Sequence, residues 1–363
     1  MKEHLVKLLI CILSLTFLVL LVVLPNKQSA PAPTPEPDTD QVQVSDAPEI
    51  SPADRAGKLV GICLPAQSGE WTDAAILLKE QLEEKGYRVA LAYGNGTAEG
   101  QTAAMNSLRL QKADCLIVAP VDSAALPDPQ KNAEGTTPIL CYGSLLMDTA
   151  NVAGYVCYDY FGMGIAIAHR IESALSLSTA YDDGRSYTTE LFMGAARDYN
   201  AILLHQGLRS VLDPYFETGV LEVLSGRLEF EDCSIAGWSA ESAAKACTTR
   251  LANHYPDRLP NICIGASDNI AAGVIQALEE TAPAEGHWPL VTGNGATEEG
   301  LAFLEQGKLF LTVFTDPADP AKACAEMVDM VLFDTQPEFP VTQTFNHVVD
   351  VPTALCDFRV MGE

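Results

Sequence analysis

The chain has 363 residues, of which 48% are hydrophobic, so it can bury a sizeable core and wholesale disorder is excluded. Its 22 lysines and arginines stand against 48 aspartates and glutamates, which gives a formal net charge of -26 at pH 7. This acidic balance argues against nucleic acid as a partner, because phosphate binding needs clustered cationic side chains.

The N-terminus carries a targeting segment. Residues 8–24 are an uncharged, mainly apolar run that follows Lys2 and Lys7. Residues 1–24 are therefore expected to be a cleaved signal peptide or an uncleaved membrane anchor. The sequence leaves both open, because the run is long for a signal peptide and slightly short of the roughly 20 residues that span a bilayer. In either case we expect an exported chain, at the outer face of the cytoplasmic membrane or in the extracellular or periplasmic space.

Residues 25–57 are rich in proline and acidic side chains, which predicts a disordered tether. From residue 58 onward, short apolar runs alternate with amphipathic stretches. The expected strands cover 58–65, 88–94, 114–120, 137–143, 153–159, 187–194, 221–226, 261–267 and 288–295. The expected helices cover 72–86, 100–113, 124–132, 161–175, 199–215, 239–255 and 269–280. This alternation predicts an α/β fold with two doubly wound parallel-sheet lobes, whose ligands bind beyond the carboxyl ends of the strands.

Ten cysteines in an exported chain would ordinarily indicate disulfides. Five of them lie in apolar runs that read as core strands: Cys63, Cys115, Cys141, Cys157 and Cys263. In that setting cysteine behaves as a small buried hydrophobe, so we expect free thiols. A disulfide between Cys233 and Cys247 stays open as the alternative.

No pattern of an enzyme active site or a metal site is present in the sequence. The chain lacks a GxxxxGK[ST] phosphate loop, an HExxH zinc motif and a GxSxG nucleophile motif. Its six histidines form no cluster, and no CxxC or Cys/His spacing occurs. The glycine-rich stretch 293–300 has the wrong spacing for a nucleotide loop and reads as a turn. We therefore expect no catalytic residue, no metal and no cofactor.

Two tryptophans lie near expected strand ends, where a ligand would bind. Trp71 follows the first strand, and Trp238 precedes a helix of the second series. A pyranose has apolar C–H faces that stack on aromatic rings, and hydroxyls that hydrogen-bond to Asp, Asn or Arg. The two rings could therefore sandwich a sugar, although each could also pack on its own helix.

From residue 58 to the C-terminus, the chain resembles a known family. The resemblance rests, in this order, on GICLPAQSGEWTDAAILLKEQLEEKGY, ELFMGAARDYNAILLHQGL, IAGWSAESAAKA, SDNIAAGVIQAL, LVTGNGATEEGLAFLEQGK and TVFTD. These stretches look like the exported monosaccharide-binding proteins of the xylose, galactose and multiple-sugar type, which serve ABC importers and sometimes chemosensory receptors. The resemblance implies the type I periplasmic-binding-protein fold, two lobes joined by a three-strand hinge. We expect residues 58–158 plus 296–335 in lobe 1 and residues 159–295 plus 336–363 in lobe 2.

The resemblance also implies ligand-binding residues. Trp71 and Trp238 match the stacking aromatics of the two lobes. Asp198 and Asn200 match a pair whose asparagine reaches sugar hydroxyls. Asp268 matches an aspartate that opens a helix beside the pocket, and a plain helix cap is the other interpretation of it.

Several charged groups of the family are replaced in this chain. Glu70 stands where the family has an arginine, Ser144 closes a Gly-Ser pair in place of Asp-Arg, and Asn294 precedes a glycine in place of Gln-Asp. A lysine of the last motif is Thr315 here. Each lost charge-assisted hydrogen bond costs roughly 1.5–3 kcal/mol of binding energy, so new partners are needed. The candidate replacements are Glu70, Arg197 and Asn294.

The expected function is an extracytoplasmic solute-binding protein that binds a monosaccharide or a related small polar ligand between the lobes and presents it to an ABC permease. The alternative is a membrane-anchored sensory protein that signals to a kinase or chemoreceptor. In either case the membrane is a partner through the N-terminal segment if that segment is uncleaved. The effector domain of a transcription regulator is disfavoured by the apolar N-terminus, and an exported hydrolase by the lack of a nucleophile–base set.

Overall fold

The computed structural model describes residues 50–124, 137–281 and 287–362, which all belong to one unit of the chain, Glu49–Glu363. The predicted signal or anchor segment, the tether up to residue 49 and most of the helix expected at 124–132 lie outside the described residues. Within the part that the structure describes, no helix is both long enough and apolar enough to cross a membrane.

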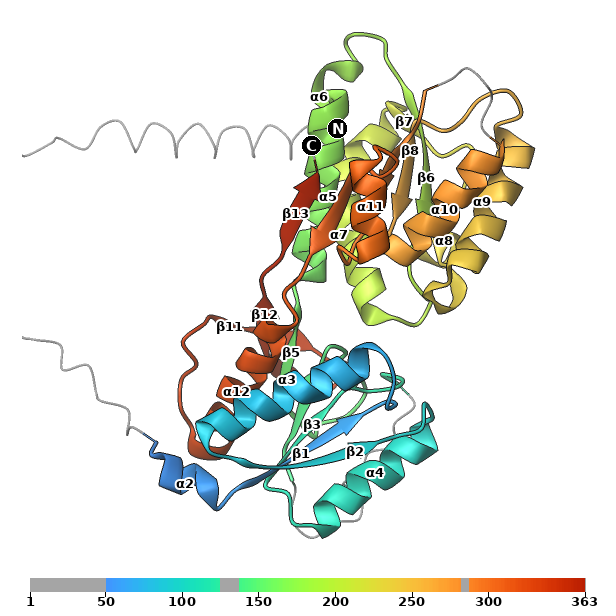
Figure 1. The fold of residues 1–363 in the computed structure, drawn as a ribbon. Helices are drawn as coiled ribbons and strands as arrows, with labels where there is room; N and C mark the ends of the chain where they lie inside the picture. Colours follow the sequence, from blue (N-terminus) through green and yellow to red (C-terminus); the bar gives the residue numbers. More distant parts are fainter. Residues whose placement is uncertain (1–49, 125–136, 282–286, 363) are drawn as a thin grey trace, which may run out of the picture. The chain divides into compact units, whose positions relative to one another are not determined.

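The first lobe is built on a seven-stranded sheet in the order β11-β12-β5-β4-β3-β1-β2 (Figure 1). Its strands are β1 (Leu59–Leu64), β2 (Arg88–Tyr93), β3 (Cys115–Val118), β4 (Ile139–Tyr142), β5 (Val152–Tyr158), β11 (Val341–Phe345) and β12 (Asp350–Cys356). Neighbouring strands are parallel, apart from the antiparallel edge pair β11 and β12. All six residues of β1 are buried, as expected for a parallel strand that is covered on both faces.

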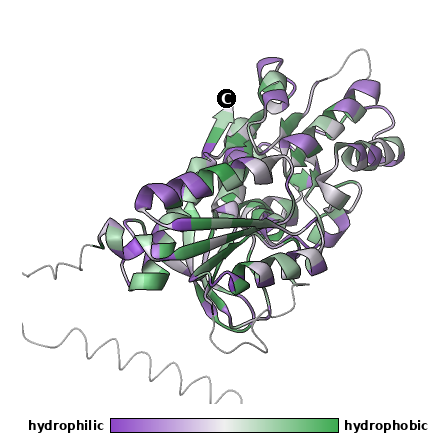
Figure 2. Cartoon of the chain, turned by 60° about the horizontal axis from the view of Figure 1, so that its bottom comes forward, coloured by the Kyte–Doolittle hydropathy of each residue, from purple (hydrophilic) through white to green (hydrophobic). Residues whose placement is uncertain are grey.

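Helices cover both faces of this sheet. On one face, Leu78 and Leu82 of α3 (Glu70–Lys85) share an apolar cluster with Met327 of α12 (Ala318–Phe333). On the other face, Met105 and Leu108 of α4 (Ala98–Leu110) form a second cluster. Figure 2 shows the strands as mainly hydrophobic and the outer faces of the helices as mainly hydrophilic. The amphipathic helices predicted from the sequence therefore bury their apolar sides against the sheet.

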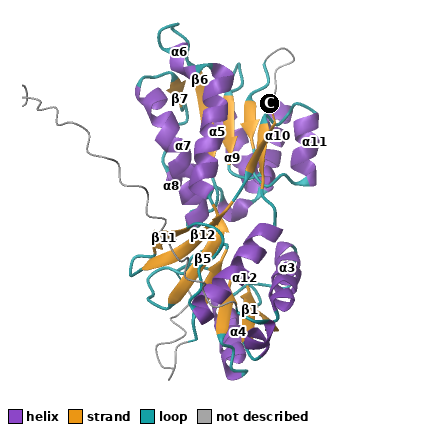
Figure 3. Cartoon of the chain, turned by 90° about the vertical axis from the view of Figure 1, so that its left-hand side faces the viewer, coloured by secondary structure: helices purple, strands orange, loops and turns teal. Residues whose placement is uncertain are grey.

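The second lobe holds a six-stranded sheet in the order β13-β10-β9-β8-β6-β7. Its strands are β6 (Tyr187–Phe192), β7 (Leu221–Glu222), β8 (Ile262–Gly265), β9 (Leu290–Thr292), β10 (Leu311–Phe314) and β13 (Arg359–Gly362). They are parallel except for β13, which runs antiparallel to β10. Its helices are α5 (Tyr160–Leu175), α6 (Leu177–Ala180), α7 (Tyr199–Glu217), α8 (Phe230–Cys233), α9 (Ala240–His254), α10 (Asp268–Thr281) and α11 (Glu298–Glu305), with a 3-10 turn η1 at Ala236–Trp238 (Figure 3).

The helices α5 and α7 cross at very short range. A Cβ atom at Gly164 would lie 2.2 Å from the carbonyl oxygen of Leu204, and one at Gly207 would lie 2.1 Å from that of Phe161. Only glycine fits at both points, because any larger side chain would push the two backbones apart.

The chain passes between the two sheets three times, as the resemblance implied. It crosses from β5 to α5, from β10 to α12 and from β12 to β13. The expected boundaries after residue 295 were wrong: α11 and β10 belong to the second lobe, whereas β11 and β12 belong to the first. The physical reason is that β10 pairs with β9 and β13, and β12 pairs with β5. The glycine-rich turn after β9 is thus a turn inside the second lobe, not a crossover.

The end of the predicted tether is ordered, which corrects the expectation of disorder up to residue 57. Residues Pro52–Ala56 form a short helix, α2, that begins with a capping box between Ser51 and Asp54. Arg55 of this helix donates two hydrogen bonds to the carboxylate of Asp329 in α12, at 2.8 and 3.0 Å. The folded region therefore starts several residues before β1.

The nine described cysteines, Cys233 and Cys247 among them, are free and buried. Burial raises the pKa of the Cys115 and Cys141 thiols to about 12, so these thiols stay protonated at neutral pH.

Candidate functional site

The carboxyl edges of the two sheets carry the residues that the sequence singled out. In the first lobe, Trp71 is the second residue of α3 and is half-buried against the cluster shared by α3 and α12. Gly69 precedes the helix with φ 49° and ψ -133°, a positive-φ conformation that glycine adopts readily and that lets the chain turn sharply between β1 and α3. Glu70 is the first residue of this helix. The turn places Trp71 at the carboxyl edge of the first sheet, as predicted.

Ser144 lies in the loop that follows β4, the fourth strand of the first lobe along the chain. The preceding Gly143 has φ 74°, and its N–H donates to the Val156 carbonyl at 2.8 Å. The N–H of Ser144 donates to the Tyr142 carbonyl at 2.8 Å. These bonds fix a tight turn that presents the Gly143 carbonyl at the carboxyl edge.

Trp238 is held rigidly at the carboxyl edge of the second sheet. Its indole Nε1–H donates to the Asp198 carboxylate at 3.1 Å, and its backbone carbonyl accepts from the Asn269 side chain at 2.6 Å. The ring lies directly over Gly194, where a Cβ atom would be 2.2 Å from it. The backbone of Trp238 has φ 55°, which is uncommon for a large side chain. Such strain persists only where the surroundings fix it, and it is concentrated at functional sites.

Asp198 has a double structural role. It caps α7 by accepting the N–H of Asn200 at 2.9 Å, and its other oxygen holds the indole of Trp238. The carboxylate therefore orients a ring rather than standing open to a ligand. Arg197, the preceding residue, is exposed in the loop between β6 and α7.

Asp268 is buried, and its carboxylate is used inside the lobe. Its Oδ2 accepts the N–H of Thr297 at 2.7 Å and the Thr297 hydroxyl at 3.1 Å, and its Oδ1 accepts the Thr312 hydroxyl at 2.6 Å. These bonds tie the start of α10 to the turn before α11 and to β10. These contacts differ from the helix cap that the sequence offered as the other interpretation, because Ser267 caps α10 by accepting the N–H of Ile270 at 3.2 Å.

Asn294 and Asn200 also meet protein partners. The side chain of Asn294 reaches the sulfur of Met163 in α5 at 3.7 Å, a weak contact. Asn200 Nδ2 donates to the Gly143 carbonyl at 2.8 Å, and its Oδ1 lies 3.2 Å from the Tyr155 hydroxyl. Asn200 thus contacts the first lobe directly.

Tyr155 and the Gly143 carbonyl were not predicted as site groups. Tyr155 sits in the apolar strand β5, where the sequence indicated only a core position. Burial raises its pKa well above the ordinary value, so the hydroxyl stays protonated and can donate a hydrogen bond. There was one indication in the sequence that Tyr155 contacts the second lobe: it is a tyrosine in a strand that leads into a crossover.

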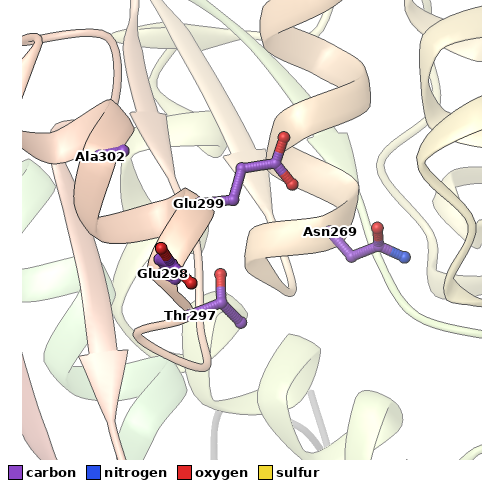
Figure 4. Close-up of a pocket in the computed structure, with 5 residues that line it drawn as sticks. All are labelled: Asn269, Thr297, Glu298, Glu299 and Ala302. Carbon is purple, nitrogen blue, oxygen red and sulfur yellow. The ribbon is translucent and has the colours of Figure 1, made fainter.

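The pocket in Figure 4 lies beside the predicted site, at the first turns of α10 and α11. It has a volume of about 570 Å³ and is lined by Asn269, Thr297, Glu298, Glu299 and Ala302. It touches the predicted site through Asn269, which bonds Trp238, and through Thr297, which bonds Asp268. Its lining holds two carboxylates and no aromatic ring, so we favour the strand edges over this pocket for sugar recognition. Among the described residues, no group of three or more His, Cys, Asp or Glu side chains could hold a metal ion.

Comparisons with known proteins agree with this architecture. The sequence profile of a family described as "Periplasmic binding protein domain" matches residues 60–335. The multiple sugar-binding periplasmic receptor ChvE of Rhizobium radiobacter is 28% identical over 308 residues, which cover 83% of this chain and 86% of that protein. The multiple sugar-binding periplasmic protein SbpA of Azospirillum brasilense is 29% identical over 279 residues, or 75% and 77% of the two chains.

A solved structure is also similar. An ABC transporter solute-binding protein from Clostridium phytofermentans, with β-D-glucose bound, superimposes with a TM-score of 0.76 at 27% identity. The alignment covers 84% of this chain and 94% of that one.

Proposed function

Because the chain belongs to the periplasmic binding protein domain family, we propose that it is an exported solute-binding protein that takes up a monosaccharide between its two lobes and presents it to an ABC importer. The relatives named above support this proposal, since they are sugar-binding receptors or a transporter's solute-binding protein. Their similarity to this chain extends over both lobes.

The observation that carries the proposal is the fixed ring of Trp238. Its indole N–H, its backbone carbonyl and its face over Gly194 are all held by neighbouring groups. A ring that is fixed before a ligand arrives loses little entropy on binding, and its face suits the apolar C–H side of a sugar. Trp71 stands at the corresponding edge of the first sheet and is proposed as the second ring.

The polar contacts to the sugar must come from groups that are not already used inside the protein. Asp198, Asn200 and Asp268 are held by protein partners. We therefore propose that Ser144, Arg197 and Asn294 supply hydrogen bonds to sugar hydroxyls, and we keep Glu70 as a proposed contact on the resemblance alone.

The proposed mechanism involves binding and lobe closure, without covalent chemistry. A ligand between the lobes favours the closed form by its higher affinity for that form. The importer then reads closure. None of the features above favours the sensory alternative, so the importer stays the proposed partner.

The test is sugar binding by the purified protein. Calorimetry and tryptophan fluorescence would be followed with D-glucose, D-xylose, other neutral monosaccharides, sugar acids and polyols. We expect saturable binding of at least one of these, weakened about tenfold or more in Trp71→Ala and in Trp238→Ala, since about 1.4 kcal/mol of stacking corresponds to tenfold in affinity.

The matched control is Trp288→Phe. Trp288 lies in the same lobe just before β9, at the amino end of that strand, where its indole N–H donates to the Lys308 carbonyl at 2.8 Å. Its replacement should leave affinity unchanged. Absence of binding to every compound of the panel would contradict the proposed function.

A further inference from the structure

A small hydrogen-bonded group joins the two lobes. Asn200 Nδ2 donates to the Gly143 carbonyl at 2.8 Å, and the Tyr155 hydroxyl lies 3.1 Å from the same carbonyl and 3.2 Å from Asn200 Oδ1. Asn200 is only 8% exposed and Tyr155 only 1%. Both ends of the Asn200 carboxamide are therefore satisfied by the first lobe.

The three groups come from elements whose positions are set separately in each lobe. Asn200 lies in the first turn of α7, which Asp198 caps in the second lobe. Gly143 follows β4, and Tyr155 lies in β5, both in the first sheet. Tyr155 is close in sequence to the first crossover, which begins where β5 ends at Tyr158. The group therefore spans the two lobes next to a hinge strand.

A hydrogen bond at this place has a different consequence from one inside a lobe. Rotation of the lobes about the crossovers would separate Asn200 from Gly143 and Tyr155, and water would replace each partner. Because water replaces the lost partners, the free energy lost per hydrogen bond is small. A tenfold change in the ratio of open to closed forms, however, needs only about 1.4 kcal/mol. A few such bonds are enough to set the balance between open and closed forms.

We propose that Asn200, Tyr155 and the Gly143 carbonyl form an interlobe latch that favours the closed form before a ligand binds. In this role Asn200 is a positioning residue, not a ligand contact. The latch sets the population of the form that holds the ligand, so it strengthens apparent affinity and slows release. The effect on affinity rests on the proposed function, but the effect on the ligand-free protein does not.

The ligand-free protein gives the direct test. One spin label would be attached to each lobe of the full chain, at the exposed positions Glu80 and Glu217, each changed to cysteine in a Cys11→Ser background. The described native thiols are buried and should not compete for the label. Pulsed electron-spin resonance then gives the distribution of distances between the lobes.

The variants are Asn200→Ala, which removes the whole carboxamide, and Tyr155→Phe, which removes one hydroxyl and keeps the ring. Both should shift the ligand-free distribution toward longer distances. The matched control is Tyr187→Phe in β6, whose hydroxyl accepts from Arg185 and lies away from the first lobe. This control should leave the distribution unchanged. Circular dichroism and thermal melting would identify a variant that fails to fold, in which case Tyr155→Phe carries the test.

Binding measurements separate the latch from a ligand contact. With D-glucose, or whichever sugar of the panel binds, the latch predicts that Asn200→Ala and Tyr155→Phe raise the dissociation rate several-fold without lowering the association rate. An unchanged ligand-free distribution in both variants would overturn the proposal. If Asn200→Ala then weakened sugar binding, Asn200 would be a ligand contact after all. If no sugar bound, the proposed function would fail while the ligand-free distances still decided the latch.

Discussion

The strained backbone of Trp238 distinguishes this residue from the other tryptophans. A left-handed conformation costs a non-glycine residue roughly 1–2 kcal/mol, and it is kept here by three separate contacts to Asp198, Asn269 and Gly194. Its carboxylate and amide partners act on the ring and the backbone independently. The ring position is therefore determined before any ligand arrives, and it depends on the absence of a side chain at Gly194.

This dependence gives a prediction that leaves the tryptophan itself in place. In Gly194→Ala the new methyl group would lie 2.2 Å from the Trp238 ring, so the ring must move. We expect a loss of about 1–3 kcal/mol in unfolding free energy from overpacking and about tenfold weaker sugar binding. Urea unfolding and calorimetry would measure the two effects.

The control is Gly57→Ala, because a Cβ atom at Gly57 has no neighbour within 4 Å and its φ is -80°. This variant should bind sugar like the native protein. Native affinity in Gly194→Ala would mean that the ring of Trp238 does not contact the ligand.

The residues at the carboxyl edges of the sheets could be predicted from the sequence, but their hydrogen-bond partners could not. Trp71, Trp238 and Asp198 lie at the carboxyl edges as predicted, because strand ends and helix starts can be read locally. The engagement of Asp268 by Thr312, 44 residues away, could not be read in that way. The same holds for Asn200, whose partner Gly143 is 57 residues distant.

Among the elements, the short helix α2 illustrates a limit of composition. Proline and acidic residues indicated a tether, yet α2 is fixed by one carboxylate from α12. Asp329 accepts two hydrogen bonds from Arg55, one from Lys85 at 2.9 Å and one from the Tyr87 hydroxyl. Asp329 lies more than 200 residues from Arg55, so the composition of the segment around α2 could not predict this contact. Between β1 and β9 the order of the longer strands and helices was predictable because their apolar periods are local, whereas the short helices α6 and α8 and every element after residue 295 were not predicted.

Removal of Arg55 should release α2 and lower stability. Arg55→Ala leaves Lys85 and Tyr87 as partners of the buried carboxylate, so we expect a loss of about 1–2 kcal/mol rather than the larger cost of an unpaired charge. Urea unfolding would measure the loss, and limited proteolysis would detect cleavage near residues 50–57. Lys58→Ala is the control, because its pair with Asp114 is more exposed than the Arg55–Asp329 pair and should contribute no more than about 1 kcal/mol.

The same cluster gives this prediction a pH dependence. Burial alone would raise the pKa of Asp329, but hydrogen bonds from Arg55, Tyr87 and Lys85 outweigh burial and lower it. A carboxyl group with a lowered pKa in the folded state stabilises the protein above its ordinary pKa of about 3.9, and this contribution is lost as the pH falls through the folded value. The difference between native protein and Arg55→Ala should therefore be full at pH 7 and should shrink below about pH 4. A difference that stayed constant down to pH 3 would show that Arg55 acts without the Asp329 charge.

At the scale of the whole molecule, the two lobes were predicted from repeated strand and helix patterns, but the later boundaries were not. The expected bounds placed a crossover after residue 295, in the turn that follows β9. This turn instead belongs to the second lobe, where Asp268 binds Thr297 and the chain continues into α11 and β10. Strand pairing between distant segments, such as β12 with β5, decides which lobe a C-terminal strand joins. No local pattern reports such pairing.

The buried free thiols have a consequence for how the protein is made. In the folded chain the described cysteines are shielded, and burial raises the pKa of Cys115 to about 12, so oxidants should not reach or activate them. In the unfolded chain each thiol has an ordinary pKa of about 8.5 and is accessible. On the proposed export route the chain emerges unfolded, so folding competes with oxidation.

Refolding from urea should therefore give a high yield with dithiothreitol and a much lower one with oxidised glutathione, because mispaired disulfides trap the chain. The folded protein in the same oxidising buffer should stay intact, and native gels with thiol titration would follow both. Equal yields in the two buffers would mean that the thiols are buried before they can react. The core that keeps sulfur out of reach in the finished protein thus restricts its assembly to a reducing environment or to a folding time shorter than that of oxidation.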